Sequence, residues 1–202
     1  MRRALLITIV CCLALPATAQ LDIFQKKPRP FLHPEGYYLV AMPRGWEGQL
    51  QADGSFAASA SRGRDQGKLT IRMASVERDV DTELVALNAH RELRKLPHFK
   101  DGGGGRLKVG GKPASIRSFE FDYMGNTEYT ISVEELYVVS GTVLFVVHFE
   151  VMKRSLRHYA LDLSIIYDSM RVAEIDATGK PTRPVRLPKR TGGSAIMPGV
   201  GK

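Results

Sequence analysis

The residues best suited to acid–base chemistry lie on an expected strand in the second half of the chain. His148 and Glu150 alternate along residues 142–151, so both side chains lie on one face of a sheet, with Ser132 and Glu120 expected on neighbouring strands of that face. Imidazole, hydroxyl and carboxylate groups together can transfer protons. The exposed face of an antiparallel sheet collects the same residue types. A solvated polar face is therefore favoured, and a small hydrolase is the alternative.

The glycine-rich stretch 102–112 resembles a phosphate-binding loop in composition only. A P-loop ending in its glycine–lysine pair would need glycine where Arg106 stands and Ser or Thr where Pro113 stands. We therefore predict a flexible loop over residues 101–105 and a hairpin turn at Gly110-Gly111.

Histidine and cysteine spacing does not indicate a metal or cofactor site. No pair among the five histidines has the spacing of a helical metal site; they are His33, His90, His98, His148 and His158. The only cysteines, Cys11 and Cys12, lie in a predicted signal peptide, so thiolate ligands and thiol nucleophiles are not expected in the mature chain. We expect no metal, no cofactor and no catalysis.

Two other features are candidates for contact with a ligand or partner. Trp46 follows Pro43 and Gly45 and offers an aromatic platform, although such a tryptophan more often seals the core, with its indole N–H bonded to a backbone carbonyl. The C-terminal tail carries basic side chains suited to an anionic lipid or polymer. The whole candidate surface comprises Trp46, His148, Glu150, Arg183, Arg186, Lys189 and Arg190.

Residues 1–19 have the features of a secretory signal peptide. Two arginines precede an apolar run over residues 4–15 that is too short to span a bilayer. Ala17-Thr18-Ala19 then offers small residues for cleavage before Gln20. We expect an exported protein, periplasmic or extracellular, with no transmembrane span.

The positive charge of the chain lies at its ends. The sequence has 29 basic and 21 acidic side chains, a net charge of +8, but residues 37–170 contain 17 of each kind. A neutral exported domain does not favour nucleic acid as a partner. The expected partner is an unknown protein or envelope component, and an anionic lipid or polymer is the alternative for the tail.

The apolar periodicity predicts an α+β domain. Strands are expected over residues 37–42, 56–60, 69–76, 114–123 and 142–151, with one more between turns at Gly125-Asn126 and Ser140-Gly141. Helices are expected over 82–96, capped by Asp81 or Thr82, and over 154–170. These elements favour an antiparallel sheet of about six to seven strands with two main helices packed on it. Before and after this single domain, which covers residues 37–171, we predict a linker over 20–36 and a disordered basic tail over 172–202.

Alternation of apolar side chains fails within one expected strand. Ile131 and Val133 are out of phase with Leu136 and Val138. We predict a β-bulge at Glu134-Glu135, which absorbs one residue and lets all four side chains join a single buried face.

Three short segments resemble the PsbP-like fold family. They are YLVAMPRGW at residues 38–46, VGGKPA at 109–114 and IIYDSM at 165–170, in an order that spans residues 36–171. The family includes an extrinsic subunit of the oxygen-evolving complex, a Ran-binding import factor and small bacterial envelope proteins. The resemblance implies an α/β/α sandwich and a binding or assembly role. It transfers no catalytic or ligand residues, because the matching positions are structural.

The resulting functional hypothesis is a non-catalytic, exported binding or accessory protein of the cell envelope. Two alternatives stay open: a small hydrolase that uses the cluster around His148, and an adaptor that binds anionic surfaces through its basic tail.

Overall fold

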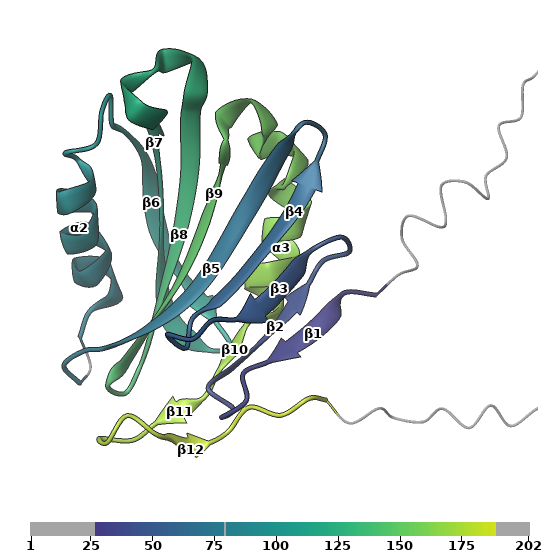
Figure 1. Ribbon diagram of the computed structural model, residues 1–202. Coiled ribbons are helices and arrows are strands. Elements are labelled where there is room, and N and C mark those ends of the chain that lie inside the picture. Colours follow the sequence, from purple (N-terminus) through teal and green to yellow (C-terminus); the bar gives the residue numbers. More distant parts are fainter. Residues whose placement is uncertain (1–26, 79, 189–202) are drawn as a thin grey trace, which may run out of the picture.

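A seven-stranded antiparallel sheet forms the centre of the protein (Figure 1). The structure is a computed structural model and describes residues 27–78 and 80–188. The strand order is β3-β4-β5-β9-β8-β7-β6, and each neighbouring pair is antiparallel. The strands are β3 (Glu47–Leu50), β4 (Phe56–Arg62), β5 (Asp65–Ser75), β6 (Lys100–Val109), β7 (Lys112–Asp122), β8 (Thr130–Ser140) and β9 (Val143–Met152).

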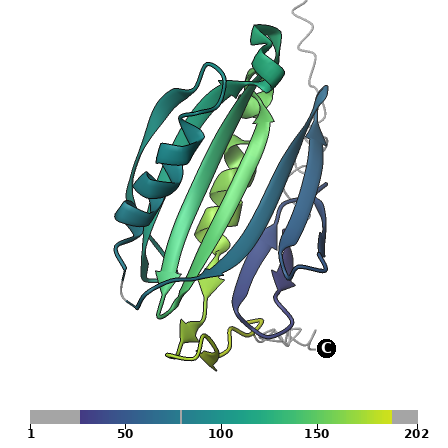
Figure 2. The ribbon, with the colours of Figure 1, turned by 60° about the vertical axis from the view of Figure 1, so that its left-hand side comes forward.

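Two helices cover opposite faces of this sheet (Figure 2). Helix α2 (Thr82–Leu93) packs on β7 and β8, and helix α3 (Ala160–Ser169) lies on the other face beside a small sheet. The small sheet has the order β1-β2-β10, formed by β1 (Arg29–Leu32), β2 (Tyr38–Met42) and β10 (Arg171–Val172). After β10 comes a two-stranded sheet formed by β11 (Glu174–Ile175) and β12 (Pro181–Arg183). The described residues also contain the 3-10 segments η1 (Tyr123–Gly125), η2 (Thr127–Tyr129) and η3 (Lys153–His158). The predicted fold class, an antiparallel sheet between two main helices, is confirmed.

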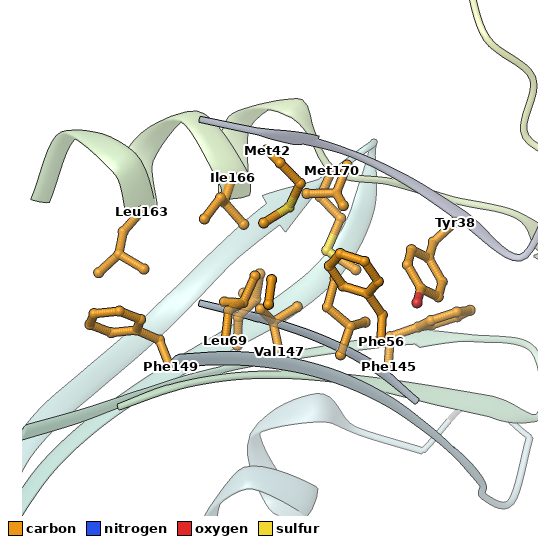
Figure 3. Close-up of a cluster of buried hydrophobic side chains, with 14 of the residues drawn as sticks. Tyr38, Met42, Phe56, Leu69, Phe145, Val147, Phe149, Leu163, Ile166 and Met170 are labelled. Atoms are coloured by element: carbon orange, nitrogen blue, oxygen red, sulfur yellow. The ribbon is translucent and has the colours of Figure 1, made fainter. Parts of the chain in front are cut away.

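The main core lies between the large sheet, α3 and β2 (Figure 3). Alternate residues of β9 point into it, and α3 contributes Leu163 and Ile166 from above. Each large apolar side chain that is fully buried contributes roughly 1.5–3 kcal/mol to stability. The largest fully buried side chains are Tyr38, Tyr159, Phe56, Phe119, Phe145, Phe149, Leu69, Ile71, Leu136, Ile166, Met170 and Val40.

The start of α2 follows its predicted capping signal. The Asp81 carboxylate accepts a hydrogen bond from the backbone N–H of Glu83 at 2.7 Å, which satisfies one of the free donors at the helix start. The helix ends at Leu93, three residues earlier than the sequence predicted, and a turn leads to Pro97.

The ends of the domain are more ordered than the sequence predicted. The prediction of a linker is wrong at residues 29–32, because β1 pairs with β2 and the next residue, His33, is buried. The prediction of a disordered tail is wrong as far as residue 185, whose N–H donates to the carbonyl of Gly36 at 2.9 Å. Val172 and Ala173 are buried, the Ala173 N–H donates to the carbonyl of Tyr37 at 2.8 Å, and β12 pairs with β11.

The glycine-rich segment is a strand and not a loop. Residues 101–105 lie in β6, the edge strand that pairs with β7, and a register shift occurs between Asp101 and Gly103. Gly103 has φ +84°, a left-handed conformation that favours glycine at this shift.

The predicted bulge at Glu134-Glu135 is wrong. The pairing of β8 with both neighbours runs through these residues without a shift. The alternation of apolar side chains changes phase because the apolar residues near one end of β8 face α2 and those near the other end face the main core. Leu136 faces the main core, whereas Val133 lies on the α2 face, where its partner Phe119 packs against His90 at a centroid distance of 5.0 Å.

The predicted closing helix is divided into two parts. The first turns form the 3-10 segment η3, and the α-helical part begins at Ala160. Within the described residues, no helix is long and apolar enough to cross a membrane. The predicted signal peptide, residues 1–19, lies outside the described residues.

Candidate functional site

A row of polar side chains crosses the α2 face of the large sheet. The strand register places Thr70 of β5, His148 of β9, Glu135 of β8 and Arg117 of β7 side by side. The sequence predicted Ser132 and Glu120 as neighbours of His148, and this is wrong. Glu120 and Ser132 are cross-strand partners of each other, and Ser132 is also the partner of Val151. Val151 belongs to the main core, so these residues lie on the face opposite to His148.

Two carboxylates hold the His148 ring. Nδ1 lies 2.8 Å from Oε1 of Glu135, and Nε2 lies 3.6 Å from Oε2 of Glu150. The Glu135 side chain is 6% exposed and that of His148 is 23% exposed, so this pair is largely removed from solvent. The other oxygen of Glu135 accepts a hydrogen bond from the hydroxyl of buried Tyr137, and Glu150 also pairs with Lys68 at 3.1 Å.

The electrostatics of the cluster stabilise a charged imidazolium. Burial lowers the pKa of His148, but the hydrogen bonds and charges of Glu135 and Glu150 outweigh burial and raise this pKa to about 9. The hydrogen bond from His148 has the largest effect on the pKa of Glu150 and lowers it. Burial acts in the opposite direction, and Lys68 lowers the pKa further, so that it reaches about 2. Burial raises the pKa of Glu135, but its bonds to His148 and Tyr137 leave the net shift downward.

This arrangement is poorly suited to acid–base catalysis near neutral pH. A general base must be unprotonated at the working pH, and His148 retains its proton well above pH 7. Both of its ring nitrogens face carboxylates, and the nearby hydroxyl of Tyr137 is bonded to Glu135. The cluster therefore has the properties of a structural ion network.

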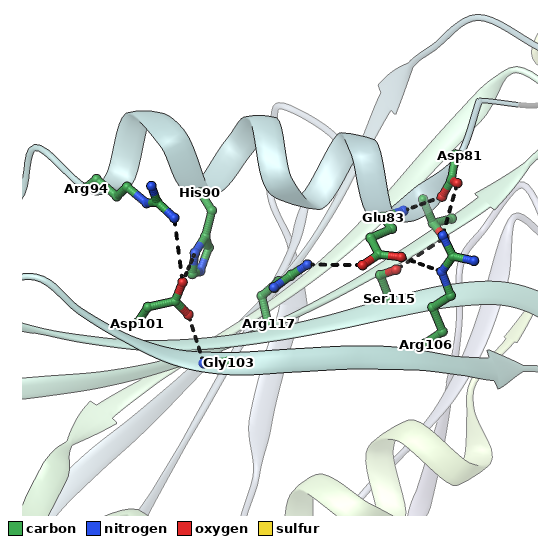
Figure 4. A network of polar contacts seen from close by, with 10 residues as sticks. Asp81, Glu83, His90, Arg94, Asp101, Gly103, Arg106, Ser115 and Arg117 are labelled. Carbon is green, nitrogen blue, oxygen red and sulfur yellow. Dashed lines mark hydrogen bonds and ion pairs between the residues drawn. The ribbon is translucent and has the colours of Figure 1, made fainter.

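Further ion pairs fix α2 over the same face (Figure 4). Glu83 of α2 bonds Arg106 of β6 and lies 3.5 Å from Arg117 of β7, while Arg94, just after the helix, lies 3.8 Å from Asp101. These contacts hold the helix over β6–β8 and leave the α2 side of β3, β4 and β5 uncovered (Figure 2).

The uncovered strands form a groove of about 550 Å³ next to the ion cluster. Its lining comes from three strands and the turn after β3, and it is mainly polar: Glu47, Gly48, Gln49, Gln51, Ala57, Ala58, Ser59, Gln66, Lys68, Leu69 and Thr70. Lys68 and Thr70 connect the groove to the cluster, since they pair across the strands with Glu150 and His148. All four residues of edge strand β3 are exposed. We define the β3–β5 groove by this lining.

Trp46 belongs to the core and offers no exposed platform. It is 8% exposed and packs edge-on against Tyr159 at a centroid distance of 6.1 Å. Its indole N–H donates to Oδ2 of Asp162 at 2.9 Å, a carboxylate that also binds Arg62. The predicted sealing role fits this position, although the acceptor is a side chain and not the backbone carbonyl that we expected.

Among the basic residues of the candidate surface, Arg183 and Arg186 do not lie on the sheet that carries the ion cluster. Arg183 ends β12, and Arg186 follows it; both are exposed. Lys189 and Arg190 lie outside the described residues. Within residues 27–78 and 80–188, no group of three or more His, Cys, Asp or Glu side chains is arranged to hold a metal ion.

Sequence reasoning missed Glu135, Tyr137 and Lys68 as members of the cluster. The assumed bulge shifted Glu135 and Tyr137 out of register with His148. Uninterrupted alternation from Ile131 would have placed both on the face of His148.

The comparisons with known proteins identify the fold. The chain is an α/β/α sandwich with an internal ion cluster and an open groove beside it, and no protein-family model and no curated protein sequence matches it. LpqN of Mycobacterium tuberculosis, described as involved in cell envelope biogenesis, is similar at a TM-score of 0.56 and 16% identity, over 75% of this chain and 94% of LpqN.

Two further structures support the same assignment. Cyanobacterial PsbP (CyanoP) from Synechocystis is similar at a TM-score of 0.53 and 11% identity, over 72% of this chain and 92% of that protein. The Ran-binding protein Mog1p of Saccharomyces cerevisiae is similar at a TM-score of 0.53 and 10% identity, over 73% of this chain and 96% of Mog1p. The chain has the PsbP/Mog1 fold, and the predicted resemblance is confirmed. Identities this low establish the fold alone.

Proposed function

We propose that this chain is a non-catalytic, exported binding or accessory protein of the cell envelope, and that it holds a protein partner in the β3–β5 groove. The single observation that carries this proposal is the groove itself. It is open, polar and bordered by the exposed edge strand β3. An edge strand offers unpaired backbone groups to which an extended segment of a partner can add as a further strand.

The chemistry of the lining suits an extended polar segment. Gln49, Gln51 and Gln66 offer amide donors and acceptors, and Thr70 adds a hydroxyl. The small side chain of Ala57, which lies on the same face as Thr70, leaves room for a partner's side chains. A protein of the same fold also has a protein partner, since Mog1p is a Ran-binding protein.

The envelope location is supported by two independent considerations. Residues 1–19 have the order of a signal peptide, and LpqN, a protein of the same fold, is described as involved in cell envelope biogenesis. The hydrolase alternative has less support because His148 keeps its proton at neutral pH. The adaptor alternative retains Arg183 and Arg186 as exposed cations.

Site-specific photo-crosslinking in exporting cells tests the proposal. A photoreactive residue at Gln49 lies in the groove, and one at Asn88 lies on the exposed side of α2 as a matched control. We expect a discrete protein adduct from position 49 that is weaker or missing from position 88. Filling the groove with Thr70→Trp should remove the adduct, whereas Asn88→Trp should not.

Several outcomes would contradict the proposal. Equal crosslinking from positions 49 and 88 would place the partner elsewhere, and retention of the chain in the cytoplasm would exclude an envelope role. A partner lost only when residues 189–202 are removed would favour the adaptor alternative.

A further inference from the structure

A second cavity lies on the opposite face of the sheet from the β3–β5 groove. It has a volume of about 470 Å³ and opens between α3, η3 and strands β7 and β8. The walls are chiefly apolar, formed by Ile116, Leu156, Ala160, Leu163 and Tyr167, with Glu134, Arg157 and Ser164 completing the lining.

Glu134 is an unusual component of this apolar wall. It lies on β8 between its cross-strand partners Ser118 and Phe149, and Phe149 is fully buried in the main core. Among the described residues, no cation pairs with its carboxylate. Burial raises the pKa of Glu134, and only the Tyr167 hydroxyl acts in the opposite direction. A half-buried carboxylate without a cation is unfavourable for folding.

Tyr167 supplies a second unused polar group. Its hydroxyl oxygen is buried and, within the part of the chain that the structure describes, has no hydrogen-bond partner of ordinary geometry. Burial, and then the negative charge of Glu134, raises the pKa of this hydroxyl, so the two groups act on each other. Buried polar groups normally have their hydrogen bonds satisfied, and an exception calls for an explanation. Here the buried hydroxyl of Tyr167 and the carboxylate of Glu134, which has no cation among the described residues, lie in the wall of one cavity.

We propose that this cavity binds a small organic amine, with its ammonium group at Glu134 and Tyr167 and its apolar body along the walls. An ammonium group has three donors, enough for both oxygens of Glu134 and the hydroxyl oxygen of Tyr167. It also supplies the positive charge that Glu134 lacks, in surroundings where charge pairing is stronger than in water. The apolar body gains from leaving water against Ile116 and Leu163.

The same arrangement disfavours other ligands. An organic anion would place its charge beside the Glu134 carboxylate. An uncharged molecule of the same shape would fill the walls but leave Glu134 without a cation. Arg157 lies at the exposed mouth and is not among the groups that shift the pKa of Glu134. This site is independent of the β3–β5 groove, so either proposal can fail without the other.

Three probes of one shape test the proposal by titration calorimetry near pH 7.5: n-hexylammonium, n-hexanol and n-hexanoate. We expect n-hexylammonium to bind about tenfold or more tightly than n-hexanol, and n-hexanoate to bind weakest. Glu134→Gln keeps the shape and removes the charge. It should weaken n-hexylammonium about tenfold or more and leave n-hexanol unchanged. Glu128→Gln, at an exposed carboxylate, is the matched control and should change neither affinity.

A second measurement does not depend on any variant. Saturating n-hexylammonium should lower the pKa of Glu134 in the unmodified protein, followed by NMR of its carboxyl carbon. The proposal is overturned if n-hexylammonium does not bind, if it binds no better than n-hexanol, or if Glu134→Gln binds it as well as the unmodified protein does. An unchanged pKa of Glu134 in the complex would also overturn it.

Discussion

Nδ1 of His148 lies 2.8 Å from Oε1 of Glu135, and the two residues are cross-strand partners on β9 and β8. A carboxylate that is 6% exposed acquires a charged partner from the adjacent strand. The pair lies at the border between the part of the sheet that α2 covers and the open groove. It therefore stabilises the sheet at the border of the β3–β5 groove.

The first prediction concerns stability and pH. The folded pKa of His148, about 9, exceeds its ordinary value of 6.5, so its contribution is complete below pH 6.5 and is lost as the pH rises through 9. The folded pKa of Glu150, about 2, lies below its ordinary 4.5, so that contribution is complete above pH 4.5 and is lost as the pH falls toward 2. Urea unfolding should show the cluster contributing most between pH 4.5 and 6.5.

His148→Gln should remove the alkaline part of that profile. We expect a loss on the order of 2 kcal/mol at pH 6, because Glu135 is left buried without its cation. The loss should shrink between pH 6.5 and 9. His158→Gln, at an exposed histidine, is the control and should stay within about 0.5 kcal/mol of the unmodified protein. Equal profiles for the two variants would contradict the account of the cluster.

The second prediction concerns the buried acceptor of Trp46. Asp162→Ala leaves the indole N–H and the Arg62 guanidinium without their shared carboxylate, and should destabilise the fold by about 2 kcal/mol or more. Asp168→Ala, on the exposed side of the same helix, should cost less than about 0.5 kcal/mol. Chemical denaturation of both variants distinguishes them, and similar losses would argue against a buried network around Trp46.

The third prediction concerns a close approach between two elements. A Cβ atom added to Gly67 would lie 2.6 Å from the ring of Tyr159, whose hydroxyl accepts the Gly67 N–H at 2.9 Å. Gly67→Ala should therefore cost about 2 kcal/mol through forced displacement of the ring. Gly105→Ala meets nothing within 4 Å and is the control. A Gly67→Ala protein as stable as the control would mean that α3 can move away from the sheet.

The fourth prediction concerns the C-terminal boundary of the domain. Cutting after Arg171 removes buried Ala173, whose carbonyl accepts from Ser140 Oγ at 2.7 Å, and should destabilise the fold on the order of 3 kcal/mol. Cutting after Pro188 keeps every described contact and should leave the melting temperature nearly unchanged. An equal melting temperature for both truncations would restore the prediction of a tail separable from residue 172 onward.

The sequence predicted the main helices and hairpins of the fold because the local signals for these elements were strong. Gly110-Gly111 indicated a hairpin, Asp81 or Thr82 a helix cap, and residues 154–170 an apolar helical stripe. Each of these signals depends on backbone preference or periodicity, and the structure identifies Asp81 as the cap. The ends of the domain could not be predicted in this way. Prolines at residues 28–34 disfavour regular structure locally, but pairing with β2 supplies hydrogen bonds from a distant part of the chain.

The candidate site was predicted only in part, for a related reason. His148 and Glu150 were assigned to one face correctly because alternation within β9 is simple. Their partners depend on the register between strands. The predicted register of β8 was wrong because a change in which face is buried was taken for a bulge. A pattern in one strand does not show which face a distant helix will cover, so Glu135 and Glu134 were both missed.

A fifth prediction concerns processing. Exported protein should begin at or near Gln20, as measured by intact mass, because small residues precede that position. Retention of residues 1–19 would contradict export through a cleaved signal peptide. A mass that includes diacylglycerol on Cys11 or Cys12 would make the protein a lipoprotein instead.

The protonation state of His148 at neutral pH distinguishes a structural ion network from a catalytic base. The measurement is an NMR titration of the His148 ring in the full chain, with His148→Gln used to assign the signal. We predict a midpoint near pH 9, so that the ring is charged throughout the neutral range. A midpoint at or below 6.5, its ordinary value, would leave His148 uncharged at pH 7 and would contradict the account in favour of the hydrolase alternative.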